Sequence, residues 1–223
     1  LAAGAVARWG GEQAVVDLEA AAKRERFWGA GAEIVSALGS VRGYHSVAAL
    51  RRLLSALKNP KVRRAVVEQL GRRGHAEDAR ALAPLARSER SLGVRAEATR
   101  ALGLLDYRRY RGIIEKNLKA RTYRDGVAAA AVSALAASRD PNAANKLLAV
   151  AKPPYRFGAR VAAIRALADY SSITPEAVPA LCALLDEPDE RISLIACAAL
   201  GRTGDERALP VLEKAAKSAG NPR

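Results

Sequence analysis

The sequence has few of the residues from which catalytic and metal sites are commonly built. Its 223 residues include two cysteines, two histidines and no methionine, and only 4% are aromatic. Cys182 and Cys197 are too few for a disulfide framework in a chain of this size. Both lie in apolar helical stretches, so we expect buried free thiols and a cytoplasmic location, with an intramolecular bridge as the alternative. His45 and His75 have no cysteine, histidine or carboxylate at ligand spacing, and we expect exposed turn residues.

Long apolar runs and catalytic motifs are also missing. No segment reaches the ~18 consecutive apolar residues of a membrane-spanning helix, so no membrane partner is expected. The chain lacks a phosphate-binding glycine loop, a nucleophile elbow and an HExxH zinc helix. The carboxylates of residues 186–190 allow a metal or acid–base site, but we favour a role at the positive N-terminus of the next helix. We therefore predict no catalytic residue, no metal ligand and no cofactor.

What the sequence does contain is an internal repeat. A leucine recurs in matching context at intervals of 32 or 33 residues, at Leu38, Leu70, Leu102, Leu135, Leu167 and Leu200. Small or branched apolar residues precede each leucine at i−4 and i−8, as at Val94 and Ala98 before Leu102, which makes one stripe on a helix. Each helix ends at glycine or alanine near a polar turn, and a second amphipathic helix follows. Asp140 and Thr174, each before a proline, are predicted caps of such second helices.

Two short helices cannot bury their apolar stripes alone, so each pair must stack on its neighbours. The sequence predicts an all-α fold, a right-handed α-α superhelix (solenoid) of about six helix pairs, with residues 1–223 as a single domain. Because both ends fall inside the repeat and the chain starts at Leu1 without methionine, we expect a fragment of a longer polypeptide.

The unit from Asp189 to Pro210, with Ala198-Ala199-Leu200-Gly201 followed by Gly204-Asp205-Glu206-Arg207, resembles the HEAT and HEAT-like (phycobilin lyase type) repeat. The resemblance covers nearly the whole chain. It is weaker in the fourth unit, around Arg124 to Val127, and in the fifth, where Pro153 and Pro154 interrupt the turn.

A narrower resemblance rests on Arg26-Phe27-Trp28-Gly29 leading to Leu38, and on Thr122-Tyr123-Arg124-Asp125-Gly126-Val127. Together these segments resemble the HEAT array at the C-terminus of aminopeptidase N type zinc metallopeptidases. That resemblance implies a structural or substrate-gating part, since the zinc site of the family lies in a separate upstream domain. No catalytic residue is carried over to this chain.

The charge distribution points to an anionic partner. The chain has a formal net charge of +14, and residues 42–125 hold 21 Lys and Arg against eight Asp and Glu. Tyr107 to Arg111 interleaves aromatic and basic side chains, as stacking nucleic-acid sites do. The candidate contacts to an anionic partner are Arg51, Arg52, Arg63, Arg64, Arg72, Arg73, Arg95, Arg108, Arg109 and Arg111.

Arg63, Arg95 and Arg160 occupy one slot in three repeats. They form either a ladder that grips phosphates or, as we favour, structural arginines that bond neighbouring units.

Three functions remain open at this stage. The first is a non-catalytic scaffold or interaction domain, with the upstream region of a metallopeptidase or a separate protein or peptide as its partner. The second is a nucleic-acid-binding protein that uses the basic surface of residues 42–125. In the third, the basic face docks an acidic protein surface, in the same polypeptide or in another.

Overall fold

The computed structural model describes residues 2–219, which contain thirteen α-helices, three short 3-10 turns and no strand. The all-α prediction is confirmed. Two compact units are present, one from Leu1 to Asn117 and one from Leu118 to Arg223, and each is described by itself. Whether residues 1–223 act as one domain stays a prediction. In the described range, no helix is both long and apolar enough to cross a membrane.

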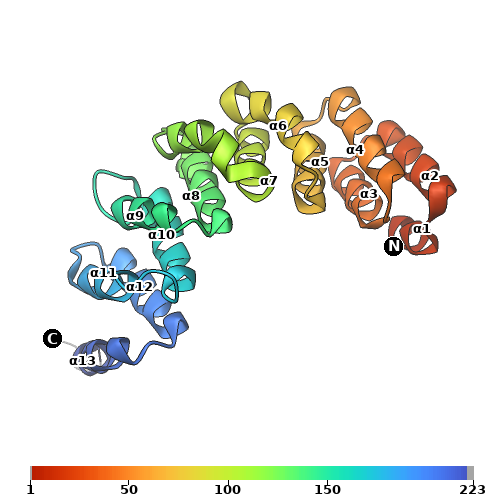
Figure 1. Ribbon diagram of the computed structural model, residues 1–223. Coiled ribbons are helices and arrows are strands. Elements are labelled where there is room, and N and C mark those ends of the chain that lie inside the picture. The colour runs from red at the N-terminus through yellow and green to blue at the C-terminus, as the bar shows by residue number, and fades with distance from the viewer. Residues whose placement is uncertain (1, 220–223) are drawn as a thin grey trace. The chain divides into compact units, whose positions relative to one another are not determined.

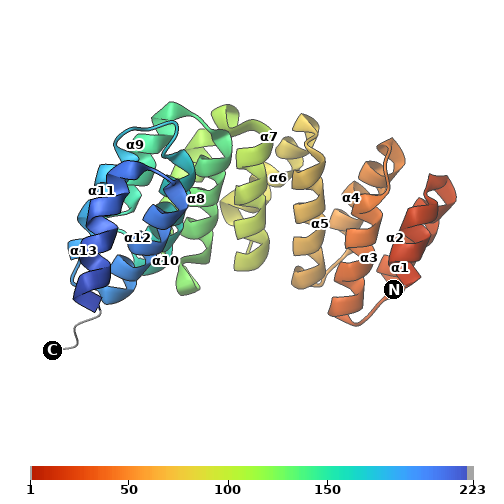
Figure 2. The same ribbon diagram turned by 90° about the horizontal axis from the view of Figure 1, so that it is seen from below.

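The first unit is a series of antiparallel helix pairs. Neighbouring pairs pack through like helices, since α3 lies against α5 and α2 lies against α4 (Figures 1 and 2). Stacking of this kind covers the apolar stripe of each pair with the next. The helices are α1 (Ala2–Trp9), α2 (Gly11–Arg24), α3 (Trp28–Ser40), α4 (Tyr44–Ala56), α5 (Pro60–Arg73), α6 (Ala76–Ser88) and α7 (Leu92–Leu118).

Helix α7 contains both helices of one repeat, joined without a loop. Its backbone leaves the helical region at Asp106, where φ is −163° and ψ is 75°. The Asp106 carboxylate accepts a hydrogen bond of 3.1 Å from the backbone N–H of Arg109. Asp106 thus ends the first helix and caps the second, so one residue connects the two helices without a separate loop.

The second unit repeats the pattern. Helix α10 packs against both α8 and α12, as Figure 2 shows. The hydroxyl of Tyr170, at the end of α10, donates to the carbonyl oxygen of Leu135 in α8 at 3.2 Å. The elements are a 3-10 turn (Tyr123–Asp125), α8 (Gly126–Ser138), α9 (Pro141–Val150), α10 (Phe157–Tyr170), α11 (Ala177–Ala183), a 3-10 turn (Leu184–Asp186), α12 (Glu190–Thr203), a 3-10 turn (Glu206–Ala208) and α13 (Leu209–Ala219).

The recurring leucines form the core of both units. All six, from Leu38 to Leu200, are at most 1% exposed. The alanines four residues earlier are buried as well, since Ala98, Ala131, Ala163 and Ala196 have no exposed surface. Each buried leucine contributes roughly 1.5–3 kcal/mol relative to an exposed one. The sequence period therefore marks the residues that hold successive helices together.

The predicted caps have different outcomes. Asp140 caps α9, since its carboxylate accepts from the backbone N–H of Asn142 at 2.9 Å. Among the acidic residues 186–190, Asp189 caps α12 through the N–H of Arg191 at 3.1 Å. The cap at Thr174 is wrong, because α11 begins only at Ala177. The backbone carbonyl of Thr174, rather than its side chain, accepts from Ala177 N–H in a preceding turn.

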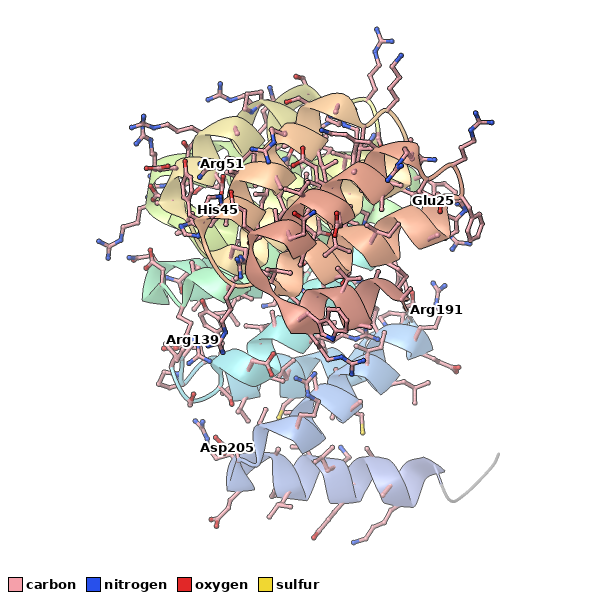
Figure 3. All side chains as sticks on the ribbon, turned by 90° about the vertical axis from the view of Figure 1, so that its right-hand side faces the viewer. Glu25, His45, Arg51, Arg139, Arg191 and Asp205 are labelled. Atoms are coloured by element: carbon pink, nitrogen blue, oxygen red, sulfur yellow. The ribbon has the colours of Figure 1, made fainter. Side chains whose placement is uncertain are left out.

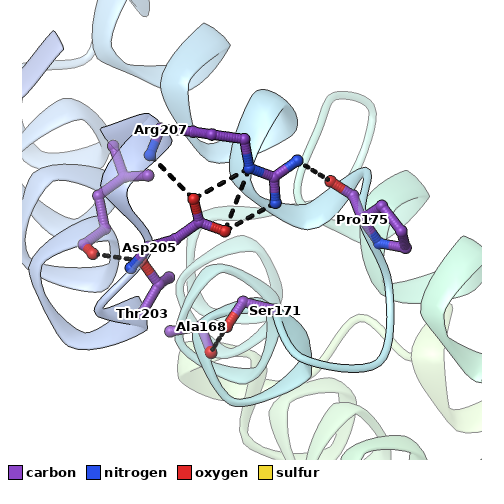
Figure 4. A network of polar contacts seen from close by, with 7 residues as sticks. Ala168, Ser171, Pro175, Thr203, Asp205 and Arg207 are labelled. Atoms are coloured by element: carbon purple, nitrogen blue, oxygen red, sulfur yellow. Dashed lines mark hydrogen bonds and ion pairs between the residues drawn. The ribbon is translucent and has the colours of Figure 1, made fainter. Parts of the chain in front are cut away.

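A polar contact ties the turn before α13 to the previous repeat (Figure 4). The Asp205 carboxylate accepts from the backbone N–H, Nε and Nη2 of Arg207 at 2.7–2.9 Å. These bonds, chiefly those from the guanidinium, lower the pKa of Asp205 to about 2. Arg207 Nη1 donates to the carbonyl oxygen of Pro175 at 3.4 Å. Asp205 thereby orients an arginine that links two repeats.

The two cysteines and two histidines lie in helices or directly before them. Both cysteines are free thiols, as expected. Both are partly exposed, so the expectation that they are buried is wrong. Desolvation raises the pKa of the Cys182 thiol. His45 and His75 are exposed, as expected. His45 lies in the first turn of α4, next to the turn that precedes it, and His75 lies directly before α6.

Candidate functional site

The first unit has a groove between its second helices α4 and α6, with α5 as its floor. Its volume is about 660 Å³. Leucines from three helices provide the apolar surface, and three cations but no carboxylate line it. The lining residues are Arg51, Leu54, Ser55, Leu57, Lys58, Arg63, Leu70, Ala81 and Leu85. We call this the α4–α6 groove.

Arg51 is held in place from the opposite wall of the groove. It projects from α4 (Figure 3), and its Nε donates to Asp78 at 2.6 Å. Its Nη2 lies 3.4 Å from the carboxylate of Glu77, also on α6. The hydrogen bond to the buried Asp78 raises the pKa of Arg51 above its ordinary value. A guanidinium has five N–H donors, so Arg51 keeps some for another anion.

Arg63 is held in a similar way near the end of α6. Its Nη1 donates to Glu89 at 2.9 Å, and 20% of its side chain is exposed. The Glu89 carboxylate also accepts from the backbone N–H of Ser91, and these bonds lower the pKa of Glu89. Both predicted arginines of the groove are thus partly neutralised by carboxylates in α6 or directly after it.

Lys58 is the cation of this groove that sequence reasoning missed. It follows the end of α4, is exposed, and has no acidic partner among residues 2–219. A signal was present, because Lys58 comes directly after Leu57, at the end of a helix whose apolar stripe continues to Leu54. The prediction favoured arginine clusters and passed over a single lysine.

A second groove lies between α5 and α7 and holds two more predicted residues, Arg64 and Arg72. Its volume is about 370 Å³, and its lining residues are Arg64, Glu68, Gly71, Arg72, Glu97, Arg100, Ala101 and Leu104. In this groove, the basic lining residues form ion pairs with the acidic lining residues. Arg64 lies 3.5 Å from Glu97, and Arg72 lies 2.6 Å from Glu68. Arg63 and Arg64, adjacent in sequence, therefore serve different grooves.

Three other predicted arginines bind elsewhere within the first unit. Arg52 forms a bidentate pair with Glu19 of α2, at 2.6–3.2 Å. Arg73 donates to the carbonyls of Val41 and Gly43 and to the Ser46 hydroxyl. Arg95 donates to Asn117 at 2.6 Å and to the Ala86 carbonyl at 3.3 Å. These contacts join neighbouring helices.

The arginine ladder has the structural role that we favoured. Arg63 and Arg95 make the contacts above, and Arg160 of the second unit donates to the Ala151 carbonyl at 2.9 Å. Arg160 also lies 2.9 Å from the carboxylate of Glu187. Each of the three is directed to a carbonyl or acidic group of its own or a neighbouring repeat.

The Tyr107–Arg111 segment does not offer stacking rings. Tyr107 and Tyr110 are only 7% and 8% exposed, because they form the buried stripe of the second arm of α7. Arg108 and Arg109 are exposed, and Arg111 lies 3.3 Å from Glu115. The interleaved pattern is therefore an amphipathic helix with a basic outer face.

Metal-binding geometry is absent from residues 2–219, where no three His, Cys, Asp or Glu side chains are grouped to hold an ion. No curated protein matches the sequence significantly. The pattern of HEAT repeats matches residues 15–103 and 156–223. The unmatched stretch contains the fourth repeat, where the resemblance is weaker. Since the match covers well over half of the chain and the helices pack in sequential pairs, the protein belongs to the HEAT repeat family.

Proposed function

We propose that this HEAT array is a non-catalytic scaffold that binds a protein partner through an acidic, amphipathic segment in the α4–α6 groove. The observation that carries the proposal is the composition of that groove. Leu54, Leu57 and Leu85 offer apolar contact, while its charged lining residues are all basic. An amphipathic helix presents its apolar anchors at i, i+3 and i+4 and its carboxylates beside them, which matches such a surface.

Charge supports the choice of an acidic partner. Arg51 and Arg63 retain N–H donors after pairing, and Lys58 has all of its donors available to a ligand. Charge-assisted hydrogen bonds to carboxylates are stronger than neutral ones. The segment belongs to a protein partner, on this chain or on another.

The test is fluorescence anisotropy with a labelled helical peptide that carries leucine anchors and intervening glutamates. We expect binding that weakens with salt, and a loss of about tenfold or more in the Lys58→Glu variant, where a repulsive charge faces the ligand. Arg90→Glu is the matched control, because Arg90 is exposed in the same unit but does not line the groove. Equal binding of a glutamine version of the peptide would overturn the proposal.

Nucleic acid is the second candidate, favoured by the exposed Arg108 and Arg109, which have no acidic partner among the described residues. The same assay with a labelled DNA or RNA duplex at ~50 mM salt separates the two functions. If Arg108→Gln with Arg109→Gln abolishes duplex binding while Lys58→Glu leaves it unchanged, the nucleic-acid function replaces the peptide function.

The narrower affiliations rest on residue resemblance alone. A structural or substrate-gating part of an aminopeptidase N type metallopeptidase and a phycobilin lyase type of HEAT-like repeat are carried by the segments quoted above. The cytoplasmic location is a separate prediction, which rests on the two cysteines. The family match is common to all HEAT arrays and does not distinguish among them. A zinc-peptidase motif in the coding sequence upstream of Leu1 is the observation that decides the peptidase affiliation.

A further inference from the structure

The second unit contains a pocket of about 390 Å³ between the turn that leads into α8 and the turn that leads into α10. These turns are the two places where the sequence departs most from the repeat. The lining residues are Leu118, Lys119, Ala120, Arg121, Asp125, Ala128, Pro154, Tyr155, Arg156 and Ala159, and we call this the α8–α10 pocket. It combines an apolar wall with several charged groups.

The inner wall of the α8–α10 pocket is apolar. Leu118, Ala128 and Ala159 line it and are at most 6% exposed. Pro154 and Tyr155, in the turn before α10, add further apolar and aromatic surface. Because the two alanines carry only a methyl group, space remains in front of them. A flat aromatic ring matches this surface, since it can pack against the methyl groups and beside the ring of Tyr155.

Asp125, the one acidic lining residue, is already occupied within the protein. It is 5% exposed, and its backbone is left-handed with φ of 53°, a strained conformation for a residue other than glycine. Its Oδ2 accepts from the backbone N–H of Gly158 at 3.2 Å. Its Oδ1 lies 3.2 Å from Nε of Arg156 as an ion pair. Asp125 therefore neutralises Arg156 and ties the turn before α8 to the start of α10.

Lys119 and Arg121 are the cations of the pocket that stay available to a ligand. Both are exposed, and neither has an acidic partner among residues 2–219. Backbone donors add little, because the N–H of Val127 at the start of α8 already donates to the Thr122 hydroxyl at 3.4 Å. An anion in the pocket is therefore recognised by two side chains, both on the turn before α8.

We propose that the α8–α10 pocket binds a small aromatic monocarboxylate. Its carboxylate pairs with the guanidinium fork of Arg121 and with the ammonium of Lys119, both of which suit carboxylate oxygens. Its ring lies against the apolar wall beside Tyr155. An uncharged aromatic ligand would leave the two cations unmatched, and a small inorganic anion would leave the wall uncovered. The pocket volume falls within the ~300–1,000 Å³ typical of small-ligand sites. This site is separate from the α4–α6 groove and does not depend on the function proposed for that groove.

An NMR titration of the whole chain with three ligands tests the site. Phenylacetate is expected to bind in the millimolar range or tighter, as suits a ligand of its size. It should shift the amide signals of Gly126 and Gly158, but not that of Ser55 in the α4–α6 groove. Phenylacetamide, which lacks the charge, and acetate, which lacks the ring, should each bind about tenfold more weakly. Equal affinity for phenylacetate and its amide, or no shift with phenylacetate at ~10 mM, overturns the proposal.

Three matched variants identify the residues. Arg121→Gln and Lys119→Gln should each weaken phenylacetate about tenfold, because each removes one charge-assisted contact. Both side chains are exposed, so neither change should disturb the fold. Lys152→Gln removes the same charge from the neighbouring turn, outside the lining, and should leave binding unchanged. An equal loss in all three variants would show attraction by overall charge alone, and no loss in the first two would show that these side chains do not hold the anion. Either result contradicts the proposal.

Discussion

At the residue scale, the arginines of the first unit differ in how many of their N–H donors already form hydrogen bonds within the protein. Arg52 donates three hydrogen bonds to Glu19, and Nη2 of Arg73 donates to three acceptors. Lys58, by contrast, has no acidic partner in the described part of the chain. Identical charges in the sequence therefore differ in function, because a paired guanidinium stabilises the array and an unpaired ammonium can meet a ligand.

The Glu19–Arg52 pair predicts a pH-dependent stability. The hydrogen bond from Arg52 is the main cause that lowers the pKa of Glu19 from its ordinary 4.5 to about 2. A lowered folded-state pKa means that the contribution is complete above about pH 4.5 and is lost as the pH falls towards 2. We expect Glu19→Gln to lower the free energy of unfolding by about 1 kcal/mol at pH 7, modest because Arg52 is largely exposed.

Urea unfolding at a series of pH values measures this effect. The difference between the parent and Glu19→Gln should shrink through the acidic range. Glu33→Gln is the control, because Glu33 is exposed on α3 and makes no described contact. A difference that is constant with pH would show that packing, rather than charge, causes the loss.

At the element scale, the closeness of neighbouring helices depends on small residues at one repeat position. The glycine after the core leucine illustrates it. A Cβ at Gly71 on α5 would lie 2.8 Å from Ala101 Cβ on α7, whereas nothing lies within 4 Å of one at Gly201 on α12. The same slot therefore has different steric demands in two repeats.

This contrast predicts opposite signs for one substitution. Gly71→Ala should lower the free energy of unfolding by about 1 kcal/mol or more, because overpacking outweighs the gain in helix propensity. Gly201→Ala should raise it by about 0.5–1 kcal/mol through propensity alone. Denaturant unfolding of both variants checks the pair, and effects of the same sign would contradict the steric explanation.

At the scale of the whole molecule, a HEAT array distributes its stability over contacts between adjacent repeats. Helices α3 and α5 pack in the first unit, and α8, α10 and α12 in the second. Loss of packing in one repeat should consequently be felt mainly by its neighbours.

Hydrogen exchange tests that distribution. Leu102→Ala removes a fully buried side chain, which costs about 2–5 kcal/mol locally, and should speed exchange in α5, α6 and α7 more than in α12. Leu104→Ala, two residues along the same helix and 55% exposed, should leave the exchange pattern unchanged. Uniform loss of protection over α1 to α13 in Leu102→Ala would instead indicate all-or-none unfolding.

The helices, their pairing and their core could be predicted from the sequence, because these features depend on local periodicity. Leucine, alanine and valine at i, i+4 and i+8 specify one buried stripe, and Asp140 before a proline specifies a cap. The same local pattern gave a wrong prediction at Thr174. The backbone carbonyl of Thr174, and not its side chain, accepts the hydrogen bond from the N–H of Ala177.

Which polar residues form sites could not be predicted in this way, because it depends on contacts between repeats. The partners of Arg51, Arg52 and Arg73 lie 26 to 33 residues away, so stacking of repeats alone brings them together and uses up their donors. Stacking also buried Tyr107 and Tyr110, and it placed the strained Asp125 against Gly158. Charge in the sequence counts ionisable groups, but folding sets how much of each group remains available to a partner.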